Sequence, residues 1–400
     1  MKQFINDIKG DRTIWAITAL LAIFSFLPVY SAASNLAYSY GSGNTFGFVV
    51  KHFMHLFLGF VIIYAIHKLP YRYFKGLSII MMPVVALLLI YTMFQIDSSD
   101  SLTNTKRWIS LPFVGFSFQP STLASVVLMV YVARYLSKIQ DKTITFKESL
   151  FPLWLPVFGI IGLIFPANFS TAAIMMLMVF VLAFIGGYPF KYLALIGGTA
   201  LVLMTVFILT FRAFPDLMPN RVDTWMSRIE RFRGDANDAD NYQIEKAKIA
   251  IATGQIQGLG PGKSRQKNFL PQSSSDFIFA IIIEEYGLIG GLMLVFLYLW
   301  FLFRVVIVAY KSQTVFGSLL AIGIGMPIVF QAFINMAVAV ELLPVTGQTL
   351  PLISSGGTSI WMTCLAIGIL ISVSADYGPG EEVGTSEENK NALDVLSEAM

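Results

Sequence analysis

The sequence predicts an all-α polytopic membrane protein with ten transmembrane helices and one large loop outside the cytoplasm, between helices 7 and 8. Hydrophobic residues make up 56% of the 400 residues and charged residues only 13%, and the mean hydropathy is +0.70. A soluble domain of this length carries a more even balance of apolar and charged residues. In addition, ten apolar stretches approach or reach the roughly 17 to 25 residues that cross a bilayer.

Seven of the apolar stretches follow one another in the first half of the chain. The first, 14–35, comes after Lys9 and Arg12, as the apolar region of a signal peptide would. Its apolar run is too long for such a region and further spans follow it, so we predict an uncleaved first helix. The next six stretches lie at 52–67, 76–95, 120–137, 150–166, 169–187 and 191–211.

A long polar segment, 212–275, separates these stretches from the last three, which lie at 277–303, 315–340 and 357–375. From Tyr377 the composition changes to Gly, Ser, Asn and Glu, which is typical of disorder. The sequence thus predicts a membrane domain over 1–376, with 212–275 as its large outer loop, and a disordered acidic cytoplasmic tail over 377–400.

Basic residues predict the orientation of these helices. An even number of spans places both termini on one side, and the segments on that side hold thirteen Lys and Arg residues, whereas the short segments opposite hold only Lys51, Lys106 and Arg107. Positive residues accumulate on the cytoplasmic side, and long loops are exempt from this rule. Both termini are therefore expected in the cytoplasm and loop 212–275 outside it.

Several classes of partner and site are disfavoured. The net charge of +3 is too small to indicate a nucleic-acid partner. The single cysteine, Cys364, cannot form an internal disulfide. His52 and His55 lie three residues apart without a third ligand, which is poor evidence for a metal site. We therefore predict no metal centre.

The large loop combines basic residues with glycines. Its Lys and Arg side chains suit the anionic headgroups of membrane lipids, and segment 242–255 has the pattern of a short helix on the membrane surface, although a plain surface helix fits equally well. Gly258, Gly260 and Gly262 precede several cations. Such a run can bind a phosphate or pyrophosphate through its backbone, while plain turns are the commoner use of these residues.

Three carboxylates mark the start of the eighth span. Asp276 stands at the mouth of this span, where an ionisable group is costly and is a functional candidate; the alternative is a helix N-cap formed with Ser275. Glu284 and Glu285 follow roughly 12 Å deeper at 1.5 Å per helical residue. We expect these two to be protonated or paired, in a structural network rather than in proton transfer.

Several motifs together resemble one family, and they run in that family's order over residues 100–376. They are Lys106-Arg107-Trp108-Ile109, Phe118-Gln119-Pro120-Ser121, Asn241-Tyr242-Gln243, Gly258-Leu-Gly-Pro-Gly-Lys-Ser-Arg-Gln-Lys267, Leu270-Pro271, Asp276-Phe-Ile-Phe-Ala280, Glu284-Glu285-Tyr-Gly287, Leu343-Pro344, Gly347 to Pro351 and Ile353-Ser354-Ser355-Gly356-Gly357. With these motifs the sequence resembles the SEDS family of peptidoglycan polymerases. The compact Gly-Lys-Ser-Arg-Gln-Lys run is more similar to the division branch, FtsW, than to the elongation branch, RodA.

The resemblance implies an inverting glycosyltransferase that polymerises lipid II, a disaccharide-pentapeptide on undecaprenyl pyrophosphate, at the outer face of the bacterial cytoplasmic membrane. It implies that Asp276 is the general base for the acceptor hydroxyl. It also implies a class B penicillin-binding protein and other division proteins as partners. No cofactor is implied, and a role for a divalent cation stays open.

The resemblance further implies a set of substrate-binding residues: Lys51, Lys106, Arg107, Gln119, Ser121, Gln243, Lys263, Arg265, Gln266, Lys267, Ser354, Ser355 and Gly356. The chain departs from the family at Thr122, Ser125, Asn168 and Ser274, where the family usually carries charged or titratable residues. We interpret these changes as the joint replacement of a buried charge network by a hydrogen-bonded one, since loss of a single partner would leave a charge uncompensated.

Two other functions are weighed against polymerisation. A lipid II flippase would also need a cavity for a polyprenyl pyrophosphate, but its ionisable groups should lie near the membrane midplane. Here most candidates lie in the outer segments. A non-catalytic scaffold of the division machinery is disfavoured only by the resemblance around Asp276.

Overall fold

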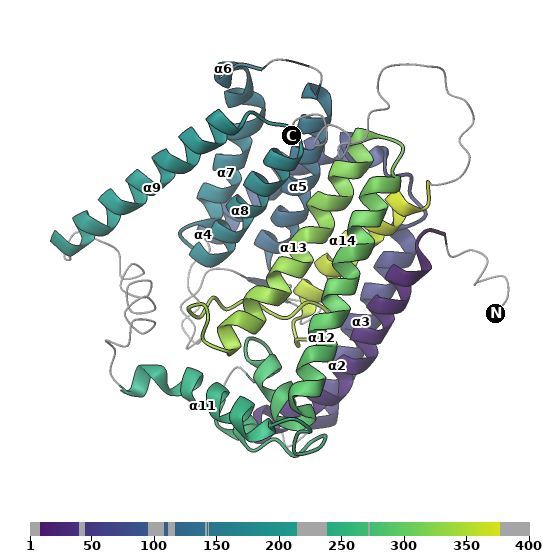
Figure 1. Ribbon diagram of the computed structural model, residues 1–400, viewed down its shortest axis with the longest axis vertical. Helices are drawn as coiled ribbons and strands as arrows, with labels where there is room; N and C mark the ends of the chain where they lie inside the picture. Colours follow the sequence, from purple (N-terminus) through teal and green to yellow (C-terminus); the bar gives the residue numbers. More distant parts are fainter. Residues whose placement is uncertain are drawn as a thin grey trace.

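The computed structural model describes residues 9–39, 45–94, 108–110, 117–140, 142, 144–213, 238–270 and 273–376. Nearly all of its regular structure is helical, which confirms the predicted class, and the helices form an elongated bundle (Figure 1). The exception is a two-residue antiparallel pair, in which β1 (Ile109–Ser110) faces β2 (Ser117–Phe118). The predicted tail 377–400 lies outside the described residues.

The first half of the bundle consists of α2 (Arg12–Ser39), α3 (Thr45–Ile66), α4 (Tyr73–Phe94), α5 (Pro120–Ile139), α6 (Phe146–Ser149), α7 (Leu155–Ile164), α8 (Phe169–Ile185) and α9 (Phe190–Ala213). A π-helical turn, η1 (Leu150–Trp154), joins α6 to α7. The second half consists of α11 (Asp238–Gly254), the 3₁₀ turn η3 (Gln266–Asn268), α12 (Ile278–Lys311), α13 (Val315–Ala339) and α14 (Gly357–Ser374).

Eight helical segments in the described residues are long and apolar enough to cross a membrane. They are Arg12–Ala33, Phe46–Ile66, Tyr73–Phe94, Pro120–Ile139, Phe146–Ile164, Ile278–Lys311, Val315–Ala339 and Gly357–Ser374. The predicted sixth and seventh spans correspond to the shorter apolar segments Phe169–Ile185 and Phe190–Val206. The membrane fold is therefore confirmed, while the count of ten stays a prediction.

Local sequence explains where several helices begin. Pro120 stands in the first turn of α5, where its missing N–H costs nothing. Asn168 precedes α8 and its side chain accepts a hydrogen bond from the Thr171 N–H. Thr314 does the same for the Gly317 N–H at the start of α13. Such caps satisfy backbone donors that a helix start leaves free.

Helices α13 and α14 form the centre of the bundle. Within the apolar stretch that could cross the membrane, 67% of α13 and 72% of α14 are buried, against 28% of α3 and 28% of α4. Helix α13 contacts α5, α8, α12 and α14. The outer helices instead expose large apolar side chains such as Phe57 and Leu87, as lipid-facing surfaces do.

Helix α11 lies across the lower end of the bundle in Figure 1. Its Ala247 and Ala250 are fully buried and belong to one apolar cluster with Phe277, Ile281 and Val338. The apolar pattern of α11 had suggested a membrane-surface helix. In the structure, its Ala247 and Ala250 pack on α12 and α13. This packing covers the part of α12 that begins beside Asp276.

The two ends of the described chain meet at the opposite end of the bundle. The Asp11 N–H donates to Ser374 Oγ over 2.8 Å. The Asp11 carboxylate is ion-paired with the Arg304 guanidinium, far along α12 from Asp276. An even number of membrane crossings between Asp11 and Ser374 agrees with this arrangement.

Candidate functional site

The segment before α12 is bound to the segment before α14. Ser354 Oγ donates to the Ser275 carbonyl over 2.6 Å. The Ser355 N–H and its hydroxyl both donate to the Ser274 carbonyl, over 2.9 and 3.0 Å. Two loops that are far apart in sequence therefore share one fixed backbone arrangement around Asp276.

Asn335 connects both loops to α13. Its Nδ2 donates to the Asp276 carbonyl over 2.8 Å and to the Gln348 carbonyl over 2.7 Å. The residue is only 1% exposed, and a buried donor that loses its partner is costly. Asn335 thus sets the relative position of Asp276 and Gln348.

Asp276 itself does not occupy the N-cap position of α12. That position belongs to Phe277, and the helix begins at Ile278. The N-cap position itself is therefore not held by Asp276, and the functional role of this carboxylate stays a prediction. Asp276 is partly exposed and lines a cavity.

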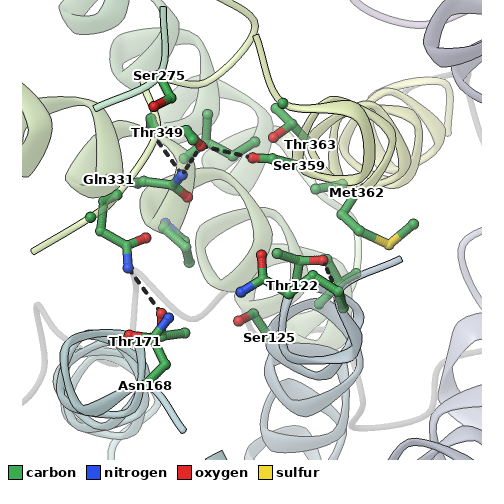
Figure 2. Close-up of a pocket in the computed structure, with 18 of the residues that line it drawn as sticks. Thr122, Ser125, Asn168, Thr171, Ser275, Gln331, Thr349, Ser359, Met362 and Thr363 are labelled. Carbon is green, nitrogen blue, oxygen red and sulfur yellow. Dashed lines mark hydrogen bonds between the residues drawn. The ribbon is translucent and has the colours of Figure 1, made fainter. Parts of the chain in front are cut away.

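This cavity has a volume of ≈ 370 Å³ and lies among α5, α8, α13 and α14 (Figure 2). Its lining includes the polar side chains of Gln119, Asn168, Gln331, Gln348 and Thr349 together with Asp276. Apolar side chains line it as well, among them Val126, Met129, Ile324, Met362 and Ala366. Among the lining residues that the structure describes, Asp276 alone has an ionisable side chain.

Neutral hydrogen bonds order the polar lining. Gln348 Nε2 donates to Thr171 Oγ1 over 2.9 Å, and Gln331 Nε2 donates to the Thr349 carbonyl over 2.9 Å; both bonds are drawn in Figure 2. Where the SEDS family usually has charged residues, Thr122 and Ser125 donate to carbonyls of their own helix region. Asn168 likewise bonds within its own region, as the cap of α8, so the joint replacement of a charge network by a hydrogen-bonded one stays a prediction.

A carboxylate within such a lining can do specific chemistry. Amide and hydroxyl side chains both donate and accept hydrogen bonds, so they suit hydroxyl and acetamido groups of a sugar. A carboxylate within reach of one such hydroxyl can act as a general base. The geometry therefore supports proton abstraction from a neutral polar substrate.

A second cavity, of ≈ 220 Å³, lies on the other side of Ser355 and Gly356, which line both. It brings together Lys51, His52 and His55 from α3 with Ser274. Among the residues described, no group of three or more His, Cys, Asp and Glu side chains could hold a metal ion. Lys51 gives this second cavity a positive charge.

The predicted basic loop residues occupy a different place. Lys263 and Arg265 are exposed and Gln266 is partly buried. Lys267 Nζ donates to Ser31 Oγ over 3.0 Å and to the Gly262 carbonyl over 2.8 Å. None of these four residues is among the described lining of either cavity.

The remaining candidates divide into three groups. Ser121 is buried in the first turn of α5, and Ser354 is buried and bonded to backbone. Gln243 lies on α11 and is partly buried. Lys106 and Arg107 lie outside the described residues.

Sequence reasoning missed Gln331, Asn335 and Gln348. The first two are amides in an otherwise apolar span, where polar side chains are costly and usually face the protein interior. Their spacing of four residues places both on one face of α13. That signal was available in the sequence.

Comparison with known proteins gives a consistent result. Residues 11–377 match the model of the FtsW/RodA/SpoVE family, described as cell cycle proteins. Probable peptidoglycan glycosyltransferase FtsW of Geobacter sulfurreducens is 31% identical over 370 residues, which are 92% of this chain and 95% of that protein. Stage V sporulation protein E of Bacillus subtilis is 29% identical over 367 residues, which are 91% of this chain and 96% of that protein.

Solved structures share the fold. A chain of a peptidoglycan synthase complex superposes with a TM-score of 0.71 at 23% identity and covers 93% of this chain and 99% of its own. Rod shape determining protein RodA of Thermus thermophilus superposes with a TM-score of 0.65 at 22% identity, over 93% of this chain and 98% of that one. The described helices therefore follow an architecture already seen in such proteins.

Proposed function

The chain belongs to the FtsW/RodA/SpoVE family of cell cycle proteins, and on that premise we propose that it is a peptidoglycan glycosyltransferase whose general base is Asp276. Relatives named as glycosyltransferases match over most of their length. The observation that carries the proposal for the base is the position of Asp276 in a cavity otherwise lined, in its described part, by neutral side chains.

The proposed reaction lengthens a glycan strand built from lipid II. Asp276 takes the proton from the 4-hydroxyl of the acceptor GlcNAc, and the oxygen attacks the anomeric carbon of the donor MurNAc. The bond between that carbon and the pyrophosphate breaks, and the lipid pyrophosphate leaves with the electron pair. Attack opposite the leaving group inverts the configuration. Formation of glycan strands from purified lipid II is the direct test.

Cations are proposed to offset the charge that develops on the leaving pyrophosphate. Lys51 lies in the cavity that adjoins the Asp276 cavity through Ser355 and Gly356, and this position supports the proposal. Lys263 and Arg265 are exposed in the outer loop, where they can meet the headgroup of a lipid substrate.

Replacement of Lys263 and Arg265 by Gln is expected to weaken binding of undecaprenyl pyrophosphate by about threefold to tenfold, because exposed charge pairs each contribute up to about 1 kcal/mol. Lys267 is kept, since its ammonium group already bonds within the protein. Titration of the lipid into purified protein in detergent measures the effect.

The matched control replaces Lys246 and Lys248 of α11 by Gln, which removes the same charge from the same outer loop. This control should bind as the wild type does. Unchanged affinity in Lys263→Gln/Arg265→Gln, or an equal loss in the control, would contradict a specific anion contact.

The proposed topology has both termini in the cytoplasm and the Asp276 cavity on the outer face. The meeting of Asp11 and Ser374 at the end of the bundle opposite Asp276 supports it. A reporter fused after Asp235 should be exposed outside the cytoplasm, and one fused after Ser386 should be cytoplasmic, as expected from the distribution of basic residues. Detection of both on the same side would rule out this topology.

Two kinds of partner are proposed. A class B penicillin-binding protein would crosslink the strands, and one structural neighbour is a chain of a peptidoglycan synthase complex that coordinates polymerisation and crosslinking. The relatives named FtsW support a role in division, with other division proteins as further partners.

A further inference from the structure

Helix α12 is broken close to the site. Gly287 has a φ of 69° and a ψ of −171°, so the helix is interrupted after Tyr286. A break leaves backbone groups without helical partners, and these must be satisfied elsewhere. Only the short segment Ile278–Tyr286 therefore connects Asp276 to the break.

The loop segment 255–260 supplies the missing backbone partners. The Leu259 and Gly260 N–H groups donate to the carbonyls of Glu284 and Glu285, each over 2.9 Å. In the other direction, the Leu288 N–H donates to the Gln255 carbonyl over 2.9 Å. The loop thus pairs with both sides of the break.

Loop segment 255–260 can approach α12 this closely only because both contact positions are glycines. A Cβ at Gly258 would lie 2.3 Å from the Glu285 carbonyl oxygen, and one at Gly287 would lie 2.2 Å from the Ile256 carbonyl oxygen. Both residues also have positive φ values, which favour glycine. Gly258 and Gly287 are therefore explained by close packing of the loop on α12, whereas a Cβ at Gly260 would first meet the Lys263 side chain and one at Gly262 would meet nothing within 4 Å.

The carboxylates at the break hold the next part of the loop. Glu284 is fully buried and accepts hydrogen bonds from Ser264 Oγ and from the Arg265 N–H, the latter over 2.9 Å. The Gln266 N–H also donates to it, over 3.3 Å. Successive N–H groups of this kind form an anion-binding concavity, and here they hold the side-chain carboxyl group of Glu284.

The neighbouring carboxylate ties the same loop to α2. Glu285 is 1% exposed and accepts from the Ser264 N–H over 3.2 Å and from Ser31 Oγ. Lys267 Nζ donates to that same Ser31 hydroxyl. Three elements are therefore fixed at the break: α2, the loop and α12.

We propose that Glu284 is a positioning residue for Asp276, a role that rests on the proposed function of Asp276 as the base. Asn335, Ser354 and Ser355 fix the backbone around Asp276 from one side. At the other end of segment Ile278–Tyr286, the buried Glu284 carboxylate fixes the loop over the break. Release of this end lets the short segment tilt, and Asp276 moves with it.

Glu284→Gln is the test, because it keeps the size of the side chain but places an NH₂ group against N–H and O–H donors. We expect kcat for glycan synthesis to fall about 10- to 100-fold, as small misplacements of catalytic groups do, with KM for lipid II within about twofold of wild type. Hydrogen–deuterium exchange should rise in 255–267 and 273–286. Both are measured on variant protein shown by thermal unfolding to be folded at the assay temperature.

Two further variants separate positioning from a general loss of structure. Glu245→Gln makes the same chemical change at an exposed site on α11 and should leave kcat and exchange as in wild type. Ser264→Ala removes the hydroxyl that donates to Glu284 and keeps the backbone N–H that donates to Glu285. In the double variant Glu284→Gln/Ser264→Ala, kcat should be little lower than in the more impaired single variant, because both substitutions act on one contact.

The inference fails if Glu284→Gln keeps wild-type kcat, if its exchange rises without a loss of kcat, or if Glu245→Gln loses as much activity. Each of these results leaves the proposed function intact as long as the wild type makes glycan strands and Asp276→Asn does not. An inactive wild type, or an active Asp276→Asn, would instead contradict the proposed function itself.

Discussion

Asp276→Asn is expected to abolish detectable glycan synthesis. Asn has nearly the same size as Asp but cannot accept a proton at neutral pH, and removal of a general base commonly costs about 10² to 10⁴ in rate. The hydrogen bond from Asn335 is made to the backbone carbonyl of residue 276, so it persists in the variant. Thermal stability and partner binding should therefore stay near wild type.

Asp376→Asn is the matched control for this variant. It makes the same change at an exposed residue that is ion-paired with Arg72 over 3.7 Å, close to Ser374 and far from the cavity. The control should polymerise lipid II at the wild-type rate. Full activity in Asp276→Asn would refute Asp276 as the base, and equal loss in the control would show that the assay reports general damage.

Asn335→Asp is expected to have the second largest effect. The substitution preserves shape but replaces the NH₂ donor by a carboxylate oxygen that faces the carbonyls of Asp276 and Gln348. Two buried hydrogen bonds become repulsive contacts, at a cost of about 1 to 3 kcal/mol or more in the free energy of unfolding. Loss of alignment between the two loops should lower kcat about 100-fold.

Two measurements test this expectation, namely the initial rate of glycan synthesis and the midpoint of thermal unfolding. Gln313→Glu is the control, because it exchanges an amide for a carboxylate at an exposed position just before α13 begins at its opposite end. Wild-type values of both quantities in Asn335→Asp would show that its two hydrogen bonds do not position the loops.

The sequence predicted the membrane helices well because their length and hydropathy are local properties. The predicted spans 120–137 and 315–340 correspond closely to Pro120–Ile139 and Val315–Ala339. By contrast, the predicted span 277–303 lies within α12, and the structure interrupts it at Gly287. That break depends on backbone partners in 255–260, and such pairing leaves no pattern in the sequence of the helix.

The candidate site was predictable only in part, because its contacts join segments that are far apart in the sequence. An isolated carboxylate at the mouth of a span drew attention to Asp276, which lines the larger cavity. The glycines and cations after Gly258 indicated an anion-binding loop, but a sequence does not say which anion is bound. The backbone of this loop binds the Glu284 carboxylate, and the role of the exposed Lys263 and Arg265 side chains stays a prediction.

Reconstitution with lipid II tests the central claim most directly. Wild-type protein is placed in liposomes that contain lipid II, together with its class B penicillin-binding protein, and two products are read from the same sample: glycan strands on a gel and lipid II exposed on the outer leaflet. A polymerase yields long strands that are absent with Asp276→Asn. Monomeric lipid II that moves between leaflets without any strand formation would contradict the account and favour a flippase.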